Sequence, residues 1–172
     1  IENDFAPAMK ELISWSRGNW PNQSTYREVL PVPERTLSPS DLGFHNTLKD
    51  NNGNIVLIDF EYFGWDDPGK LIGDFILHPG MALSEDMIKS WILGVSEIYG
   101  ECVLPRVRAM WPLLGLCWCL ILLNEFRRDI WIRRQQASSG PVENKDVVFD
   151  RQLNRSKKML VQIQSGYEQF LL

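Results

Sequence analysis

The apolar run LLGLCWCLILL, from Leu113 to Leu123, constrains the fold of this chain more than any other feature. It contains no charged side chain and ends where Asn124 and Glu125 follow it. A helix that spans a lipid bilayer needs about 20 apolar residues, so this run is too short for a membrane span. It therefore predicts a buried central helix, which must be covered by other segments of the chain.

The size and composition of the chain fit one folded domain without a nucleic-acid or membrane partner. Its 172 residues, of which 44% are hydrophobic, suffice for a single domain with a real core. The net charge of −4 argues against a general nucleic-acid binder, which usually carries a basic face. No signal peptide is visible at the start, and we expect a cytoplasmic protein.

The cysteines and histidines do not predict a metal or disulfide framework. Two histidines and three cysteines are too few for a convincing zinc site. Cys117 and Cys119 lie two apart in the apolar run, so on a helix they point to different faces. We interpret them as buried free thiols, which fit a reducing compartment.

Helical spacing predicts helices on both sides of the apolar run. The first is indicated by Phe5, Met9, Leu12 and Ile13, with a stop at Gly18. A second begins after Ser84 and ends at Gly100, and its expected buried stripe consists of Met87, Ile88, Trp91, Ile92 and Val95.

The prolines and the C-terminal apolar stripe complete the helical pattern. Pro105 is expected to open the helix of the apolar run, and Pro112 to kink or restart it. After an expected loop over residues 136–146, apolar side chains recur in steps of three and four. That stripe suits a coiled-coil seam or packing against the same domain, and it consists of Phe149, Leu153, Ser156, Leu160, Ile163, Tyr167 and Phe170.

A short hairpin is the one β element that the sequence predicts. Residues 47–49 and 55–60 are expected strands, and the turn-forming residues 50–54 separate them. Residues 19–40 are rich in Pro, Asn and Ser and are expected to be irregular. The predicted fold class is thus mainly α with a small β-hairpin, in one domain over residues 1–172.

Asp41, Asn46 and Asp59 lie at intervals typical of phosphoryl transfer. In the kinase catalytic loop an Asp accepts the proton of the attacked hydroxyl, and an Asn five residues later binds metal. A second Asp, after a hairpin, holds the Mg²⁺ that bridges the phosphates. The same spacing also suits a polar surface loop followed by a strand with a capping Asp. A hairpin followed by Ile58 and Asp59 favours the catalytic interpretation.

Two stretches resemble one family of small-molecule kinases. SPSDLGFHNTL (38–48) and IVLIDFEYFGWDDP (55–68) are similar to the aminoglycoside phosphotransferase and choline kinase group. That group carries His-x-Asp-x-x-x-x-Asn and then Ile-Asp-Phe or Ile-Asp-Trp. IDFEY resembles the choline and ethanolamine kinase version. WDDP, with Asp74 behind it, resembles the Gly-Asp-Pro and following Asp of the phosphotransferases.

This resemblance implies a fold, a reaction and a set of roles. The fold would be the C-terminal lobe of a protein-kinase-like enzyme that uses ATP and Mg²⁺. Its acceptor would be an alcohol, such as a sugar, an amino alcohol or an aminoglycoside-like compound. Asp41 would be the catalytic base, Asn46 and Asp59 the Mg²⁺ ligands beside ATP, and Glu61 would lie close to the metal or substrate.

The sequence departs from the family pattern in two ways. Pro39 stands where the family has the His that braces the loop, and His45 cannot be assumed to replace it. The chain has neither a Gly-x-Gly-x-x-Gly loop nor a recognisable strand with the phosphate-binding Lys. We therefore expect the N-terminal, ATP-covering lobe to be absent from this chain, which would be inactive alone. The alternative is a non-catalytic, kinase-derived binding or regulatory module.

Further polar and aromatic residues have two interpretations each. Asn124 and Glu125 could face the acceptor pocket or form an ordinary helix end. Asp67 and Asp74 could be local caps. A cationic acceptor could be attracted by negative charge from Glu125, Asp129, Asp66 and Asp67. An aromatic pocket for a quaternary amine, or simply core packing, could use Trp65, Trp118 and Trp131.

Overall fold

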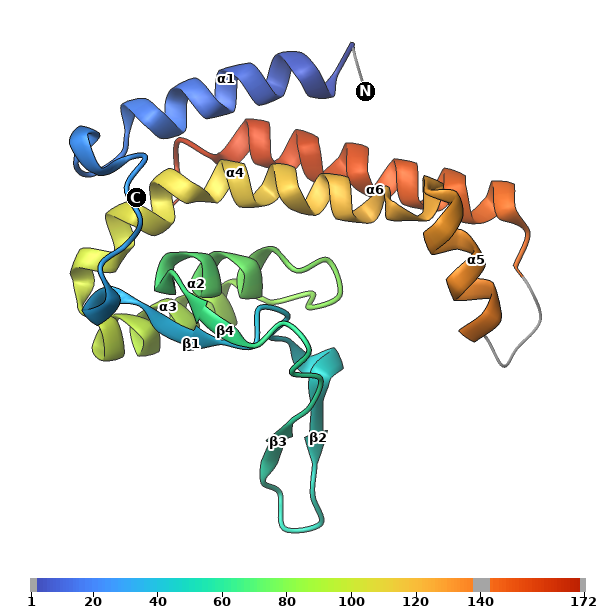
Figure 1. The fold of residues 1–172 in the computed structure, drawn as a ribbon, viewed down its shortest axis with the longest axis horizontal. Coiled ribbons are helices and arrows are strands. Elements are labelled where there is room, and N and C mark those ends of the chain that lie inside the picture. The colour runs from blue at the N-terminus through green and yellow to red at the C-terminus, as the bar shows by residue number, and fades with distance from the viewer. Residues whose placement is uncertain (1–2, 138–142, 171–172) are drawn as a thin grey trace.

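Helix α4 (Leu104–Leu122) lies at the centre of the computed structural model, which describes residues 3–137 and 143–170. Three helices pack against it, namely α1 (Phe5–Gly18), α2 (Pro68–Leu77) and α6 (Lys145–Gly166) (Figure 1). The predicted buried central helix is therefore confirmed. Pro105 lies in its first turn as expected, but α4 continues through Pro112, so the predicted restart there is wrong.

The same helix also satisfies a length and hydropathy test for a membrane span. The segment Glu101–Phe126 has a mean hydropathy of 1.6, and half of the tested window is buried inside the protein. Core helices pass this test as well, and the buried face of α4 packs against α1, α2 and α6. That face consists of Val107, Ala109, Pro112, Leu114, Gly115, Leu116, Trp118, Cys119 and Leu122.

Helix α6 runs along α4, and its stripe belongs to the core. Leu160, Ile163 and Tyr167 are buried in the same cluster as α4 residues. Ser156 interrupts the apolar stripe because its hydroxyl donates to the carbonyl oxygen of Cys119 at 2.9 Å. Packing against the same domain, rather than a coiled-coil seam, accounts for this stripe. The expected loop over 136–146 lies partly outside the described residues; α5 reaches Ala137 and α6 begins at Lys145.

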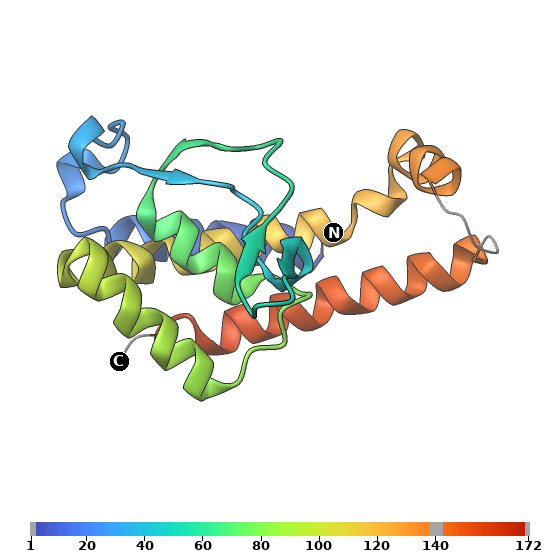
Figure 2. The ribbon, with the colours of Figure 1, turned by 90° about the horizontal axis from the view of Figure 1, so that it is seen from below.

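Two helical predictions hold for the helix boundaries, but only in part for the residues on the buried faces. In α1 the buried side is Phe5, Ala8, Leu12 and Ser16, whereas Met9 and Ile13 are exposed. Helix α3 (Glu85–Tyr99) begins after the Ser84 cap, which accepts from the Met87 amide, and ends at Gly100 with φ of 79°. Of its expected stripe only Val95 is buried, because α3 lies at the edge of the body and covers α2 with one side (Figures 1 and 2).

The β structure consists of two antiparallel strand pairs. Strands β2 (Thr47–Lys49) and β3 (Ile55–Leu57) form the predicted hairpin, which projects from the helical body in Figure 1. Strand β3 stops at Leu57 rather than at the predicted Phe60, because Asp59 has φ of 63° and cannot continue a strand.

The second strand pair was not predicted. Strand β1 (Thr36–Ser38) pairs with β4 (Gly64–Asp66), so that Ser38 lies opposite Gly64. Residues 36–38 belong to the stretch that was expected to be irregular, and this part of the prediction is wrong. The pairing matters because it brings the segments that contain Asp41 and Asp59 to the same side of α2 (Figure 2).

Candidate active site

The loop after β1 is fixed by serines. Ser38 is fully buried, and its Oγ accepts from the Ser40 amide at 3.0 Å. Ser40 has φ of 61°, and its hydroxyl donates to the carbonyl oxygen of Tyr62 at 3.2 Å. Positive φ is uncommon for residues other than glycine, and such strain collects at functional sites. Ser40 and Asp59 therefore mark the loops on both sides of the hairpin as candidates for a site.

The side chain of Asn46 bonds directly to Asp41. Its Nδ2 donates to the backbone oxygen of Asp41 at 2.9 Å and to Oδ2 of the same residue at 3.1 Å. Both bonds use the amide nitrogen, which leaves the amide oxygen of Asn46 as a candidate metal ligand. The side chain of Asp41 is 40% exposed, so a substrate hydroxyl can reach it.

The hairpin returns the chain beside Asn46. The Ile58 amide donates to the backbone oxygen of Asn46 at 2.9 Å, and Asp59 follows immediately. The Glu61 carboxylate raises the pKa of the Tyr62 phenol by hydrogen bonding and by its charge, with smaller contributions from Asp59 and Asp41. Acidic groups from both loops thus contribute to the raised pKa of one exposed phenol. Oxygen ligands of this kind suit Mg²⁺, and a metal site at Asn46, Asp59 and Glu61 stays a prediction.

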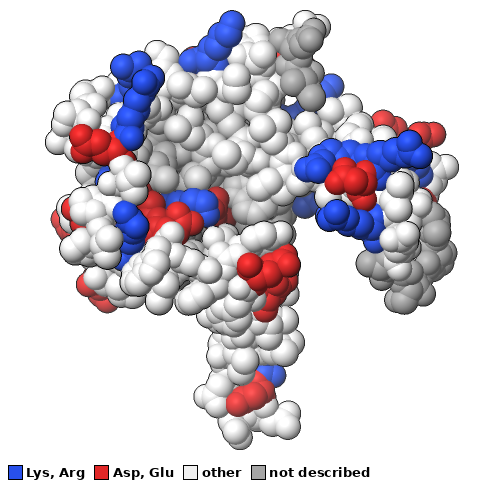
Figure 3. All heavy atoms as spheres, viewed as in Figure 1, with Lys and Arg blue, Asp and Glu red and all other residues white. Residues whose placement is uncertain are grey.

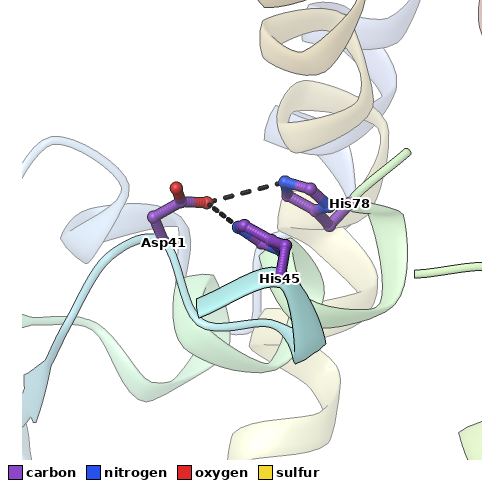
Figure 4. A group of neighbouring side chains, drawn as sticks. All are labelled: Asp41, His45 and His78. Atoms are coloured by element: carbon purple, nitrogen blue, oxygen red, sulfur yellow. Dashed lines mark hydrogen bonds and ion pairs between the residues drawn. The ribbon is translucent and has the colours of Figure 1, made fainter. Parts of the chain in front are cut away.

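Two histidines lie on the same side of Asp41 (Figure 4). Nε2 of His45 lies 3.2 Å from Asp41 Oδ1, and Nε2 of His78 lies 3.6 Å from the same oxygen. The two imidazole rings stack, with centroids 4.2 Å apart and an angle of 12° between the planes. The three side chains form a group whose ligand atoms lie within 4.8 Å of one another.

His78 is the functional candidate that the sequence did not reveal. It follows the last residue of α2, and its amide donates to the Asp74 carbonyl oxygen at 2.9 Å. Its side chain is 15% exposed. The His78 and Trp118 rings form a T-shaped pair with centroids 4.6 Å apart. Burial lowers the pKa of His78, as does the charge of His45, while Asp41 opposes them. Only the packing of α2 beside the loop reveals this neighbour of Asp41, since no local motif marks it.

Acidic residues on and before α2 are already paired. Lys70 Nζ lies 2.8 Å from Asp66 and 3.1 Å from Asp74. Asp67 caps α2 by accepting from the Gly69 amide at 2.7 Å, and it also bonds to Arg106. In Figure 3, red acidic atoms and blue basic atoms adjoin one another at the centre left of this face. The cap expected at Asp67 is confirmed, but Asp74 lies inside α2 and does not cap it.

Burial sets the electrostatics of Asp74. Burial raises the pKa of this carboxyl, although Lys70 and the Trp118 indole N–H oppose the shift. Trp118 Nε1 donates to Asp74 Oδ1 at 3.0 Å. Because Trp118 also contacts His78, Asp74 belongs to the packing that supports the candidate site.

Asn124 and Glu125 lie in a 3₁₀ turn after α4 (Asn124–Phe126). Glu125 is only 3% exposed and pairs with Arg134 of α5 (Arg128–Ala137). Gln152 approaches the same carboxylate at 3.5 Å, and Glu125 Oε2 is buried with no hydrogen-bond partner among the described residues. The alternative of an ordinary helix end that emerges into solvent is therefore wrong for Glu125. A contact with the acceptor stays a prediction.

The remaining candidate residues, Asp129 and the three tryptophans, lie in different environments. Asp129 is exposed and pairs with Arg127 at 2.9 Å. Trp65 is exposed on β4, Trp118 packs beside His78, and Trp131 contacts Phe149 with ring centroids 5.5 Å apart. Core packing accounts for Trp118. The three tryptophans have different neighbours, so they do not form one aromatic pocket.

The loops around Asp41 combine a fixed carboxylate with further oxygen ligands. A carboxylate can accept a proton from a hydroxyl, and binding of a hard cation by Asn46 and Asp59 stays a prediction. Comparison of the chain with protein-family models, curated proteins and solved structures finds no match.

Proposed function

We propose that this chain is the C-terminal, catalytic lobe of a small-molecule phosphotransferase with a protein-kinase-like fold. The full-length protein would transfer the γ-phosphoryl group of ATP to an alcohol acceptor. One observation carries the proposal: Asn46 bonds to Asp41 through its side chain and to Ile58 through its backbone. Asn46 thereby adjoins both Asp41 and the residue before Asp59, which supports a site shared by these two loops.

Each residue of the proposed site has a separate role. Asp41 accepts the proton of the acceptor hydroxyl, and its exposed side chain leaves room for that hydroxyl. Asn46 and Asp59 would hold Mg²⁺, with Glu61 close by. Mg²⁺ bound together with ATP supplies positive charge where negative charge develops on the phosphate oxygens. Most of the catalysis then comes from positioning, to which the hairpin contributes by fixing Asp59 beside Asn46.

The acceptor would be a sugar, an amino alcohol or an aminoglycoside-like compound, in a cytoplasmic setting. Asn124 and Glu125 remain the proposed acceptor contacts. Because the sequence contains no glycine-rich loop, the phosphates would be covered by an N-terminal lobe outside this chain. The 172-residue chain alone should therefore show no transfer above background.

Substitution of Asp41 tests the catalytic assignment. In the full-length protein, Asp41→Ala should lower phosphoryl transfer at least about a hundredfold, the scale of a lost general base. Its thermal unfolding should stay close to wild type, because the side chain is partly exposed. Asp150→Ala, an exposed acidic position on α6, is the matched control and should retain activity. Turnover of wild-type size in Asp41→Ala would exclude the proposal.

A second candidate is a kinase-derived binding module without catalysis. Pro39, in the position of the family's bracing His, favours it. Titration calorimetry of the full-length protein with a non-hydrolysable ATP analogue separates the two candidates. An enzyme should bind the analogue more tightly with Mg²⁺, and Asp59→Asn should weaken this coupling more than Asn46→Ala. Nucleotide binding that ignores both Mg²⁺ and Asp59→Asn would favour the module.

A further inference from the structure

We propose that His78 is a positioning residue for Asp41, which it orients by donating its Nε2 proton to Oδ1. The proposal rests on the proposed phosphotransferase function and adds a residue to it. Pro39 cannot supply a side-chain donor to this loop, whereas His78 reaches it from the end of α2. The separation of 3.6 Å in this structure is longer than an ideal hydrogen bond and would shorten when substrate closes the site.

The backbone determines which nitrogen of His78 carries the proton. The Gly80 amide donates to His78 Nδ1 at 3.0 Å. A backbone N–H can only donate, so Nδ1 must offer its lone pair. In the neutral ring the proton is then on Nε2, the atom that faces Asp41 Oδ1. His78 thus donates to the carboxylate without needing a positive charge.

The same contact argues against a metal ion on this cluster. Asp41, His45 and His78 lie close enough together to be considered as ligands. A histidine that binds metal through Nε2 carries its proton on Nδ1 and donates it to an acceptor. Here Nδ1 of His78 faces the Gly80 N–H donor instead, so ligation through Nε2 would leave the ring without a proton. The geometry suits a donor to Asp41 better than a metal ligand.

Packing holds the His78 ring in this orientation. One face stacks on His45, and Trp118 meets the ring at an angle of 81°. Gly43 leaves space for His45, because a Cβ at that position would lie 2.5 Å from Cε1 of the His45 ring. A ring that is fixed on two sides loses little further freedom when it donates to a carboxylate.

This arrangement distinguishes the two oxygens of Asp41. Oδ1 faces both imidazoles, with Nε2 of His45 at 3.2 Å and Nε2 of His78, the proposed donor, at 3.6 Å. Oδ2 accepts one bond from Asn46 and keeps a lone pair. Oδ2 is therefore the oxygen that accepts the substrate proton, on the side of the proposed Mg²⁺ ligand Asn46.

Histidine NMR tests the arrangement without any assay of activity. Long-range ¹H–¹⁵N spectra of the histidine-labelled 172-residue chain distinguish the two neutral tautomers of each ring. We expect His78, assigned by its loss in His78→Gln, to carry its proton on Nε2 at neutral pH. Detection of the Nδ1–H tautomer at His78 would overturn the proposal.

Kinetics of the full-length protein test the positioning role. His78→Phe keeps an aromatic ring beside His45 and Trp118 but removes the donor, and kcat should fall about tenfold or more. His78→Gln keeps an N–H donor and should retain kcat within about threefold of wild type. KM for ATP should change little in either variant, because His78 lies beside Asp41, the proposed catalytic base, and does not contact ATP.

The outcomes of the two experiments separate the two proposals. Wild-type kcat in His78→Phe, or an equal loss in both folded variants, would overturn the positioning role. A wild-type protein that transfers no phosphate to any alcohol would overturn the proposed function instead, and the spectra would still decide the His78–Asp41 arrangement. Matched thermal unfolding of the variants excludes a general loss of folding as the cause.

Discussion

The helical body and the hairpin region of this chain use the same residue types in opposite ways. In the body, Leu12, Ile72 and Val107 are fully buried between helices. In the hairpin, all three residues of β3 are exposed although they are Ile, Val and Leu. Apolar side chains therefore stabilise the body, whereas the exposed apolar side chains of the hairpin contribute little to the stability of the fold. Stability and candidate chemistry lie in different regions.

The hairpin, together with the loops on both sides of it that contain Ser40 and Asp59, depends on the helical body for its shape. Two strands of three residues are too short to be stable alone in water. Positive φ at Ser40 and Asp59 adds strain, which persists only where the surroundings fix the chain. Contacts from α2 and the segment after it provide that support, including His78 beside Asp41 and Met81 Sδ, which accepts from the Phe44 amide at 3.1 Å.

The largest expected effect is the loss of a body side chain. Leu12→Ala should lower the free energy of unfolding by about 2–5 kcal/mol, because it removes apolar contacts and leaves a cavity. Denaturant unfolding of the chain measures this loss. Met9→Ala on the same helix is the control, since Met9 is exposed and should contribute less than about 1 kcal/mol. Equal losses at both positions would contradict the assigned buried face of α1.

The next effect comes from the buried thiol of Cys119. Burial raises its pKa from 9.0 to about 11, whereas Cys117, which was also expected to be buried, is exposed. Between these values the unfolded chain releases the thiol proton but the folded chain keeps it, so stability falls as pH rises. The loss from pH 9 to 11 should approach about 2–3 kcal/mol. Unfolding curves across this range, compared with Cys119→Ala, measure it; an identical pH dependence in the variant would contradict the assignment.

Local sequence rules predicted the features that local chemistry determines. Ser84 and Gly100 bound α3 because a hydroxyl cap and a left-handed glycine act within one helical turn. The hairpin was expected because the residues between its strands favour a turn, and Asp50 Oδ1 does accept from the Asn52 and Asn54 amides.

Features that depend on distant segments were not predictable in this way. The pairing of Thr36 with Asp66 joins short strands that carry no periodic signal. His78 becomes a neighbour of Asp41 only after α2 packs beside the loop. Glu125 looked like the end of a helix, and its burial depends on Arg134 from the next helix. Each of these cases needs a tertiary contact that sequence spacing does not encode.

A smaller effect measures the strain in the hairpin region. Asp59 has φ of 63°, which Asn tolerates better than Ala does. Asp59→Asn should therefore leave the unfolding free energy nearly unchanged, whereas Asp59→Ala should lower it by about 1 kcal/mol. Chemical denaturation of both variants tests this difference. Equal stability of the two variants would show that the backbone at this position relaxes. If the stabilities differ as expected, Asn is the safer substitution for metal-binding experiments.

The smallest effect should come from the hairpin side chains. Val56 is 48% exposed and lies opposite Leu48 in the strand pair. Val56→Thr keeps the β-branched shape and replaces one methyl by a hydroxyl that water can reach. In the 172-residue chain it should change the unfolding free energy by less than about 0.5 kcal/mol. A loss as large as that of Leu12→Ala would mean that the hairpin supports the fold, and the contrast between the two regions would then be wrong.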